Sequence, residues 1–431
     1  MLRRKIEQQL LAWKNQKEKN CLVIRGARQV GKTWIVEKFA RENYKNLVVL
    51  NFIENPGYSS IFDGDLNVDN LVTQMSVRVK DAHLVPGETL IFLDEIQHCP
   101  NARTALKFLS IDKRFDVIAT GSLLGLNHKE VSSFPVGYTD QLEMFSLDFE
   151  EFLWANGMTD ASIASLKSYF DQKTVVPMAI HQRMMELFRL YILVGGMPNV
   201  VWDFVNNHDL HRVLNMQRSI LRDYEDDIAK YAEGSEKAKA RACFLSIPRQ
   251  LAKDYKKFQY SVVEKKGTAK KFGGSLAWLY DAGTINFCYN LKRPELPFEG
   301  NVEEDCFKVY MRDTGLLIAM LDDGAQEDIL DGNLGIYKGA IYENIIADIF
   351  GKAGKKLYYF EKSSGMEIDF FIRHLRKATA IEVKSAENTK AKSLSTLMKS
   401  GLVEQAIKLS GRNVEKRGST VNLPLYMAMF L

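Results

Sequence analysis

The spacing of apolar residues in the N-terminal part of the chain predicts alternating strands and helices. Mainly apolar runs at residues 21–24, 89–93 and 115–119 are typical of strands buried on both faces of a sheet. After the first run, residues 33–41 carry an apolar stripe at helical spacing. Strands that alternate with helices in this way are expected to form a parallel sheet.

The middle of the chain is predicted to be helical. Residues 184–193 repeat apolar side chains at spacings of three and four, and this helix is expected to end at the Gly-Gly-Met-Pro sequence of residues 195–198. Between residues 237 and 311 the spacing of apolar residues predicts three short helices and then two strands, at residues 284–291 and 307–311. Three helices followed by a β-hairpin make a winged helix.

The C-terminal part has one helical pattern and three strand patterns. A helix is predicted over residues 337–350, and strands are predicted over residues 357–360, 367–372 and 380–384. The whole chain is therefore expected to be an α/β protein with four domains: a parallel-sheet domain at 1–150, a helical lid at 151–235, a winged helix at 236–325 and an α/β domain at 326–431.

Length and composition narrow the class of protein. The chain has 431 residues, more than one core normally covers, with 46% hydrophobic and 26% charged residues. No apolar run is long enough for a membrane span, and the basic start lacks the apolar stretch of a secretory signal. The five cysteines never form C-x-x-C, which favours reduced thiols. We therefore expect a cytoplasmic protein without a membrane partner.

The strand at residues 21–24 leads into a sequence that fits the phosphate-binding loop (P-loop) pattern G-x-x-x-x-G-K-[ST] without mismatch. Its glycines let backbone N–H groups point at a phosphate, and the following helix N-terminus adds a favourable dipole. Lys32 is predicted to reach the outer phosphates of ATP, and the Thr33 hydroxyl is predicted to bind Mg²⁺. The predicted ATP-binding residues are Gly26, Ala27, Arg28, Gln29, Val30, Gly31, Lys32 and Thr33.

Two further strand ends carry residues suited to ATP hydrolysis. The strand at residues 89–93 is followed by Asp94, a predicted Mg²⁺ ligand, and by Glu95, which is predicted to orient the attacking water. The strand at residues 115–119 is followed by Thr120 and Ser122, small hydroxyl residues expected to sense the terminal phosphate. An ordinary solvated strand end is the alternative in each case.

The winged-helix segment is rich in basic residues. Between Arg249 and Lys271 it holds eight basic residues against two acidic ones, with Tyr255, Phe258, Tyr260 and Phe272 interleaved there or next to it. A basic face of this kind predicts contact with DNA phosphates. One alternative stays open. The winged helix would contact a protein partner or a second copy of the chain, and its lysines would merely be solvated. The basic residues are Arg249, Lys253, Lys256, Lys257, Lys265, Lys266, Lys270 and Lys271.

A second candidate catalytic group lies near the C-terminus. Asp369 and Glu382 lie on neighbouring predicted strands, and alternation places Lys384 on the same side as Glu382. One carboxylate on each strand and a nearby lysine form an arrangement that binds Mg²⁺ and activates water for phosphodiester cleavage. Glu343, on the predicted helix, is expected to complete the metal shell. Such folds can lose catalysis while keeping their shape, so cutting activity is a separate question.

These motifs together resemble a large family of bacterial and archaeal ATP-binding proteins that pair an AAA-type ATPase module with a C-terminal domain of undefined function. The resemblance implies that a winged helix is followed by a restriction-endonuclease-like α/β fold. It also implies that the Gly-Gly-x-Pro element approaches the nucleotide from a second domain. The segments that carry it are residues 26–33, 92–95, 120–122, 148–153, 195–198 and 309–317, with Glu343, Asp369, Glu382 and Lys384.

One position departs from the family pattern. Tyr138 follows Pro135-Val136-Gly137, where many relatives carry Gly-Arg, so this loop offers no arginine finger. Arg114, close before a predicted strand, is a substitute candidate.

Three classes of function remain open. The first is an ATPase coupled to a DNA-binding, Mg²⁺-dependent nuclease-like domain. The second is a nucleotide-switch ATPase that binds DNA or a protein partner through an inactive nuclease-like fold. The third, a DNA-translocating motor, is disfavoured because no helicase motifs accompany the loop.

Overall fold

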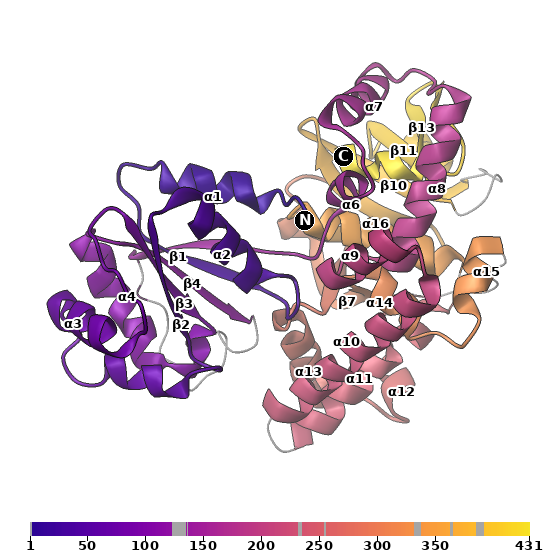
Figure 1. Cartoon of the computed structure of the whole chain (residues 1–431). Coiled ribbons are helices and arrows are strands. Elements are labelled where there is room, and N and C mark those ends of the chain that lie inside the picture. Colours follow the sequence, from indigo (N-terminus) through magenta and orange to yellow (C-terminus); the bar gives the residue numbers. More distant parts are fainter. Residues whose placement is uncertain are drawn as a thin grey trace. The chain divides into compact units, whose positions relative to one another are not determined.

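The structure is a computed structural model that describes residues 2–122, 135, 137–231, 235–253, 256–331, 338–362, 365–384 and 392–431. It consists of two compact units (Figure 1). The N-terminal unit comprises Arg4–Ser146 with Asp281–Gly283, and the C-terminal unit comprises Met1–Arg3, Leu147–Tyr280 and Thr284–Leu431.

A five-stranded parallel sheet forms the centre of the N-terminal unit, in the order β2-β3-β4-β1-β5. Its strands are β1 (Cys21–Gly26), β2 (Asn46–Asn51), β3 (Thr89–Asp94), β4 (Asp116–Ser122) and β5 (Thr139–Glu143). The helices of this unit are α1 (Ile6–Lys14), α2 (Lys32–Asn43), η1 (Pro56–Phe62), α3 (Val68–Arg78), η2 (Ile96–His98) and α4 (Pro100–Asp112).

Successive strand residues point to opposite sides of a sheet, so consecutive apolar residues make both faces of this sheet apolar. On β1, Cys21 and Val23 pack in the same cluster as residues of α3 and α4, whereas Leu22 and Ile24 pack with residues of α1 and α2. The predicted parallel sheet with its flanking helices is confirmed. The apolar pattern did not indicate β5, in which Leu142 is the one aliphatic residue.

The C-terminal unit combines helices with a second sheet. Its first helix, α6, begins with a capping box in which Asp148 and Glu151 each bind the other's backbone N–H. The helices of this unit are α6 (Phe149–Ala155), α7 (Asp160–Gln172), α8 (Met178–Val194), α9 (Pro198–Asn207), α10 (Leu210–Tyr231), α11 (Ser235–Leu251), α12 (Tyr260–Val263), α13 (Ala269–Asp281), η3 (Phe298–Asn301), α14 (Thr314–Ala319), α15 (Ala325–Asp331), α16 (Lys338–Lys352), α17 (Lys392–Lys399) and η5 (Leu425–Phe430).

Eight strands form the sheet of the C-terminal unit, in the order β12-β13-β11-β10-β9-β8-β6-β7. The hairpin expected after the three short helices is present as β6 and β7, and β6 also pairs in parallel with β8. The hairpin therefore belongs to the same sheet as the C-terminal strands. These strands are β6 (Ile285–Leu291), β7 (Val302–Met311), β8 (Leu357–Glu361), β9 (Glu367–His374), β10 (Lys377–Val383), β11 (Gln405–Ser410), β12 (Glu415–Arg417) and β13 (Thr420–Pro424).

One hydrophobic cluster extends through the C-terminal unit and includes Phe188 of α8, Phe272 of α13 and Ile346 of α16. These residues come from segments expected to be three separate domains. The boundaries near residues 235 and 325, and the likeness of the last segment to restriction endonucleases, stay predictions. None of the helices in the described part of the chain is both long enough and apolar enough to cross a membrane.

The Gly-Gly-Met-Pro element ends α8 in a buried polar network. The backbone N–H of Gly196 donates to the carboxylate of Asp313 at 2.8 Å, and Asp313 also caps α14. Lys352 of α16 lies 3.8 Å from Asp313 and 3.1 Å from Asp348. A Cβ atom at Gly196 would lie 2.1 Å from the backbone oxygen of Leu147. Packing within the C-terminal unit thus accounts for a glycine at position 196.

Candidate functional site

The phosphate-loop sequence forms the turn between β1 and α2, at the carboxyl edge of the parallel sheet. Gly31 precedes α2 in a left-handed backbone conformation, with φ of 93°, which glycine adopts without steric cost. Gly26 lies against Met144, whose backbone oxygen would be 2.3 Å from a Cβ atom at position 26. The backbone geometry therefore requires glycine at both positions, independently of phosphate binding.

The ammonium group of Lys32 is held at the loop itself. The side chain is buried, and Nζ donates hydrogen bonds to the backbone oxygens of Gly26 at 3.0 Å and Ala27 at 2.8 Å. Burial lowers the pKa of Lys32 to about 8, although the nearby charges of Glu95 and Asp94 oppose this shift. A phosphate group at the loop would give this ammonium a strong additional counter-charge.

Asp94 is the residue at which the loop and two neighbouring strands meet. The Thr33 hydroxyl donates to its Oδ2 atom at 2.9 Å, and the Asn51 amide donates to the same atom at 3.1 Å. The Thr120 hydroxyl donates to the other oxygen, Oδ1. Burial raises the pKa of Asp94, while the hydrogen bonds from Thr120 and Thr33 lower it. The structure thus brings together three of the residues predicted from sequence.

Asn51 is a member of this group that the sequence analysis missed. It ends β2, which pairs with β3 in a register that places Asn51 directly beside Asp94. Its own side-chain oxygen accepts the backbone N–H groups of Ile53 and Glu54 at 3.0 Å, which fixes the orientation of its amide. A polar residue at the carboxyl end of an apolar run was the available signal.

Glu95 follows β3 directly and has a left-handed backbone, with φ of 55°. This conformation is uncommon outside glycine and is frequent at functional sites. The Gln97 side-chain amide donates a hydrogen bond to the Glu95 carboxylate. The remaining candidate, Ser122, has its side chain outside the described part of the structure. Arg114, the substitute arginine finger, is ion-paired with Asp69 at 2.7 Å and with Asp112 at 2.8 Å.

The residues at the loop fit a magnesium ion. Mg²⁺ prefers hard oxygen ligands and usually takes one or two from the protein while phosphates and water supply the rest. The Thr33 hydroxyl and the Asp94 carboxylate supply two such oxygens, 2.9 Å apart. Together with Lys32, Thr33 and Asp94 have the chemical groups that a site for a triphosphate and its metal ion requires.

The carboxylates predicted near the C-terminus gather in one buried cluster. Glu343 lies on α16, Asp369 on β9 and Glu382 on β10. The antiparallel register of β9 and β10 pairs Phe370 with Ile381, so Asp369 and Glu382 lie next to this pair on adjacent strands. Within the cluster, the backbone N–H of Val383 donates to Asp369 at 2.7 Å.

Lysine side chains neutralise this cluster. Both Lys256 and Lys308 approach Glu343: Lys256 makes an ion pair with Oε1, and Nζ of Lys308 lies 3.7 Å from Oε2. Lys308 is almost fully buried and lies 2.5 Å from Glu367. The predicted residue Lys384 lies 2.5 Å from Glu382. The roles of Lys256 and Lys308 were not expected, although a lysine within the apolar run of β7 was a signal.

The electrostatics of the cluster follow from burial and charge. Burial and the charges of Glu343 and Glu382 raise the pKa of Asp369 well above its usual range. Burial also raises the pKa of Glu382, against the charge of Lys384. Burial would raise the pKa of Glu343 too, but the charges of Lys256 and Lys308 lower it overall.

The donor atoms of the cluster do not fit a metal ion in this arrangement. No group of three or more His, Cys, Asp or Glu side chains in the described residues is placed to hold one. Both oxygens of Glu343 and one of Glu382 are already contacted by ammonium groups. The expected roles of Asp369, Glu382 and Glu343 in Mg²⁺ binding therefore stay predictions.

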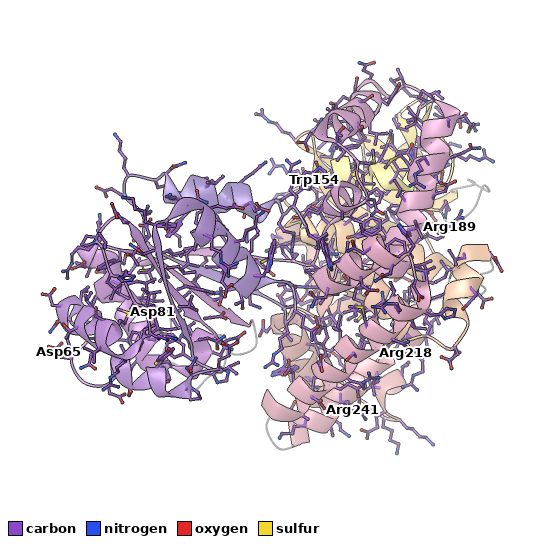
Figure 2. All side chains as sticks on the ribbon, viewed as in Figure 1. Asp65, Asp81, Trp154, Arg189, Arg218 and Arg241 are labelled. Atoms are coloured by element: carbon purple, nitrogen blue, oxygen red, sulfur yellow. The ribbon has the colours of Figure 1, made fainter. Side chains whose placement is uncertain are left out.

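The basic segment divides into paired and exposed residues. Lys253 donates to Gln259, Lys257 to Cys306, and Lys271 to Glu264. Arg241 of α11, labelled in Figure 2, pairs with Glu225 at 2.7 Å. Lys265, Lys266 and Lys270 are exposed, and Lys271 is both exposed and paired.

The aromatic residues of this segment are placed for packing. Phe258 and Phe272 are buried in the hydrophobic core, and Tyr260 is half-buried. Phe258 stacks on Phe307, with ring centroids 5.9 Å apart. Tyr255 lies outside the described residues. Phe258 and Phe272 therefore do not form a platform for nucleic-acid bases.

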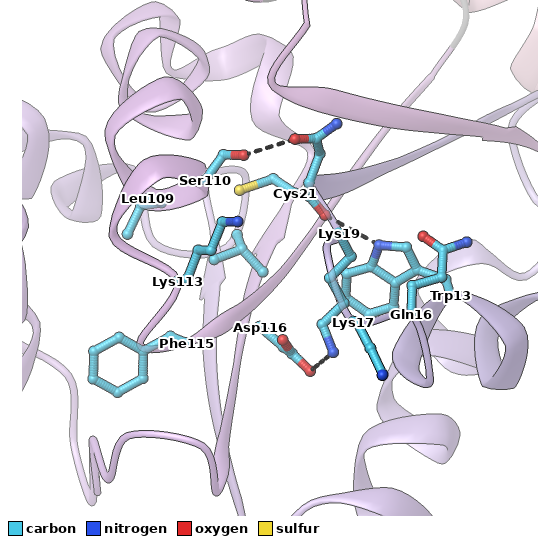
Figure 3. A pocket seen from close by; sticks show the side chains of 12 residues that line it. Trp13, Gln16, Lys17, Lys19, Cys21, Leu109, Ser110, Lys113, Phe115 and Asp116 are labelled. Atoms are coloured by element: carbon cyan, nitrogen blue, oxygen red, sulfur yellow. Dashed lines mark hydrogen bonds and ion pairs between the residues drawn. The ribbon is translucent and has the colours of Figure 1, made fainter.

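A separate cavity of about 200 Å³ lies at the opposite edge of the parallel sheet, near the amino ends of β1 and β4 (Figure 3). Its polar groups contact one another: Lys19 pairs with Asp116 at 2.9 Å, and Ser110 donates to Asn20 at 3.1 Å. The cavity shares no residue with the phosphate loop.

Three families match successive parts of the chain. Residues 18–153 match an AAA domain, residues 185–327 match a domain of unknown function (DUF8612), and residues 338–426 match another (DUF4143). The part of the chain that is similar to an AAA domain thus contains the parallel sheet and the P-loop described above. No curated protein is significantly similar to the chain.

Several solved structures are distantly similar. A Walker-type ATPase of Pyrococcus abyssi is 14% identical with a TM-score of 0.43, over 74% of this chain and 96% of its own. The Aeropyrum pernix Orc1 protein in complex with DNA is 12% identical with a TM-score of 0.31, over 77% and 92%. AMPPCP-bound DnaA from Aquifex aeolicus is 11% identical with a TM-score of 0.27, over 64% and 86%. Scores this low do not establish a shared fold for the whole chain.

Proposed function

We propose that this protein binds ATP with Mg²⁺ at the phosphate loop and hydrolyses it. The observation that carries the proposal is the convergence on Asp94, where the loop hydroxyl of Thr33 and the strand-end hydroxyl of Thr120 share one buried carboxylate. The match of residues 18–153 to an AAA domain supports the same conclusion.

Each residue has a distinct role in this proposal. Lys32 binds the outer phosphates, and Thr33 and Asp94 hold the Mg²⁺ ion, which when bound neutralises charge on the phosphate oxygens. Glu95 orients the attacking water. Thr120 links the end of β4 to Asp94, so that a change at the terminal phosphate reaches the neighbouring strand.

Substitutions at two positions test the proposal. Lys32→Ala removes the phosphate-binding charge and is expected to weaken ATP binding by about 2 to 5 kcal/mol. Glu95→Gln is expected to keep ATP binding and to lose turnover, because only the positioning of water is removed. Titration with a fluorescent ATP analogue and a phosphate-release assay measure the two effects. Unchanged ATP affinity in Lys32→Ala would refute the assignment.

We also propose that the exposed lysines around α12 and α13 bind duplex DNA. Lys265, Lys266 and Lys270 are exposed side chains close together in sequence, and lysines on phosphates bind with little sequence preference. The alternatives, a protein partner or a second copy of the chain, would use the same surface. A cytoplasmic location also stays a prediction.

Charge reversal tests the DNA proposal. Lys265, Lys266 and Lys270 changed to Glu should abolish duplex binding, and wild-type affinity should fall steeply with salt because released counterions drive association. A matched control changes the exposed residues Lys399 and Lys416 to Glu. Gel shifts from low to physiological salt measure both. Absence of binding by the wild type at every salt concentration would favour a protein partner.

The buried acidic cluster supports two versions of the C-terminal function. Asp369, Glu382 and Lys384 are the residue types expected of a nuclease-like site, which supports a nucleotide-controlled nuclease. The ammonium groups on Glu343 and Glu382 support the other version, a switch ATPase with an inactive nuclease-like fold.

Plasmid cleavage with Mg²⁺, with and without ATP, distinguishes the two versions. Cleavage that Asp369→Asn abolishes, while ATP turnover continues, supports the nuclease. Absence of cleavage under all conditions supports the inactive fold.

A further inference from the structure

Arg4 places a buried guanidinium group against the phosphate loop. The residue precedes α1 and is 6% exposed, although arginine is rarely buried without partners. One arm of its fork, Nη1, donates to the backbone oxygen of Val30 at 3.1 Å, and the other, Nη2, donates to the backbone oxygen of Phe145 at 2.7 Å. Because the fork is planar and rigid, it can hold two chain segments at a fixed separation.

The contact with Val30 orients the peptide group that joins Val30 to Gly31. A trans peptide is planar, so its N–H points to the side opposite its C=O. Since Arg4 holds the Val30 oxygen, the N–H of Gly31 points away from the guanidinium. In a phosphate loop the backbone N–H groups are the donors to the phosphates. Arg4 thus controls the direction in which one of these donors faces.

The conformation of the loop needs such a restraint. Gln29 and Gly31, on either side of Val30, both have left-handed backbones, with φ of 63° and 93°. This geometry is uncommon for a residue such as Gln29, and it persists where the surrounding structure imposes it. Turn conformations with successive N–H groups on one side form the concavities in which proteins bind anions. A hold on the peptide between Gln29 and Gly31 therefore stabilises the form of the loop that binds phosphate.

Arg4 is itself anchored within the N-terminal unit. Its backbone N–H donates to Oε1 of Glu7 at 2.9 Å, and Oε2 of Glu7 pairs with Lys38 of α2 at 2.6 Å. Leu10 of α1 and Val30 of the loop belong to one hydrophobic cluster. The guanidinium therefore has a fixed base from which it contacts the loop.

We propose that Arg4 is a positioning residue for ATP binding, whose guanidinium fixes the Val30–Gly31 peptide so that the Gly31 N–H can meet a phosphate before nucleotide arrives. The proposal rests on the ATP-binding function proposed above and adds a residue that acts through the loop. Without Arg4, a smaller fraction of molecules has a competent loop, and the apparent affinity falls by that fraction. Once ATP is bound, its phosphates hold the loop N–H groups, so turnover at saturating ATP should change little.

The test compares ATP affinity with turnover in the full-length protein. Arg4→Ala is expected to weaken binding of a fluorescent ATP analogue by about 10-fold or more, while kcat stays within about threefold of the wild type and KM rises. A substitution that only destabilised the fold would lower the melting temperature without this split between KM and kcat. Arg41→Ala is the matched control, because Arg41 lies on α2, is exposed and pairs with Glu37 at 2.7 Å. It should bind ATP as the wild type does.

Chemical rescue adds a readout that a structural role would not move. Ethylguanidinium reproduces the part of the side chain that Arg4→Ala removes. At low millimolar concentration it should restore several-fold of the lost ATP affinity, whereas ethylammonium should not, because only the fork can reach both backbone oxygens at once. Neither compound should change the affinity of the wild type or of Arg41→Ala. Equal rescue by the two compounds would overturn the role of the fork.

Wild-type ATP affinity in Arg4→Ala overturns the proposal, as does a lower kcat with an unchanged KM. If Arg4→Ala does not fold, Arg4→Met keeps most of the buried volume without a hydrogen-bond donor, and the same outcomes decide. Lys32→Ala separates the two levels of the argument. Equal binding by wild type and Lys32→Ala refutes the ATP-binding function itself. Loss of binding in Lys32→Ala together with full binding in Arg4→Ala keeps that function and removes the role of Arg4.

Discussion

At the scale of single residues, burial of the Lys32 ammonium opposes folding. Burial lowers its pKa from 10.5 to about 8, so between these pH values the unfolded chain binds more protons than the folded protein. The free energy of unfolding should therefore rise with pH across this window, and below pH 8 the cost of burying the charge is about 3 kcal/mol.

We predict that Lys32→Met raises the melting temperature of the nucleotide-free protein at pH 7 and abolishes ATP binding. The gain should shrink at pH 10, where the wild-type lysine has lost much of its proton. Thermal unfolding at both pH values measures this. Lys38→Met, on the same helix but with its ammonium paired to Glu7 at 2.6 Å, is the control and should show no such gain. A gain independent of pH would contradict the explanation.

Asp348 should impose the opposite pH dependence. Burial raises its pKa from 3.8 to about 7, although Lys352 opposes the shift. The folded protein then binds more protons than the unfolded chain between these values, and stability from this group falls as pH rises from about 4 to 7. We predict that Asp348→Asn flattens the dependence of unfolding free energy on pH in this window, by up to about 4 kcal/mol. Urea denaturation at pH 5 and pH 7.5 measures it, and parallel curves for the two proteins would argue against the assignment.

At the scale of elements, the turn between α8 and α9 depends on close backbone packing. A Cβ atom at Gly196 would lie 2.1 Å from the Leu147 backbone oxygen. The surrounding backbone of the C-terminal unit is packed, so it cannot move to remove this steric clash without a large loss of stability. We predict that Gly196→Ala lowers the free energy of unfolding by more than about 3 kcal/mol. Gly273 of α13 has no atom within 4 Å of its Cβ position, so Gly273→Ala should raise stability by about 1 kcal/mol. Equal effects of the two substitutions in denaturant titrations would disprove the packing argument.

At the scale of the whole molecule, the two compact units should respond differently to nucleotide. The phosphate loop belongs to the N-terminal unit, and a ligand stabilises the unit that binds it by about 2.7 kcal/mol at one hundred times its dissociation constant. We predict two calorimetric transitions, of which Mg²⁺–ATP raises one. Lys32→Ala should abolish that shift and leave the other transition in place. A single transition that moves as a whole would show that the units unfold together.

Much of the N-terminal unit could be predicted from local sequence. The apolar runs of β1, β3 and β4 follow from strands covered on both faces, and the phosphate loop follows from the steric needs of Gly26 and Gly31. These features depend on neighbours in the chain, so a pattern of a few residues specifies them. Asn51 could not be assigned, because its contact with Asp94 depends on which strand lies beside β3.

The sequence by itself determined the phosphate loop, the two acids at the end of β3, and the order of one helix and three strands from α16 to β10. Only the tertiary structure decided that the β6–β7 hairpin joins β8 in one sheet, and that Lys256 and Lys308 reach Glu343. Pairing between distant segments depends on strand register and on which charges must be neutralised once buried. A short sequence pattern specifies neither the strand register nor the charges that become buried. The pattern therefore indicated the carboxylates of the C-terminal cluster and not the lysines that accompany them.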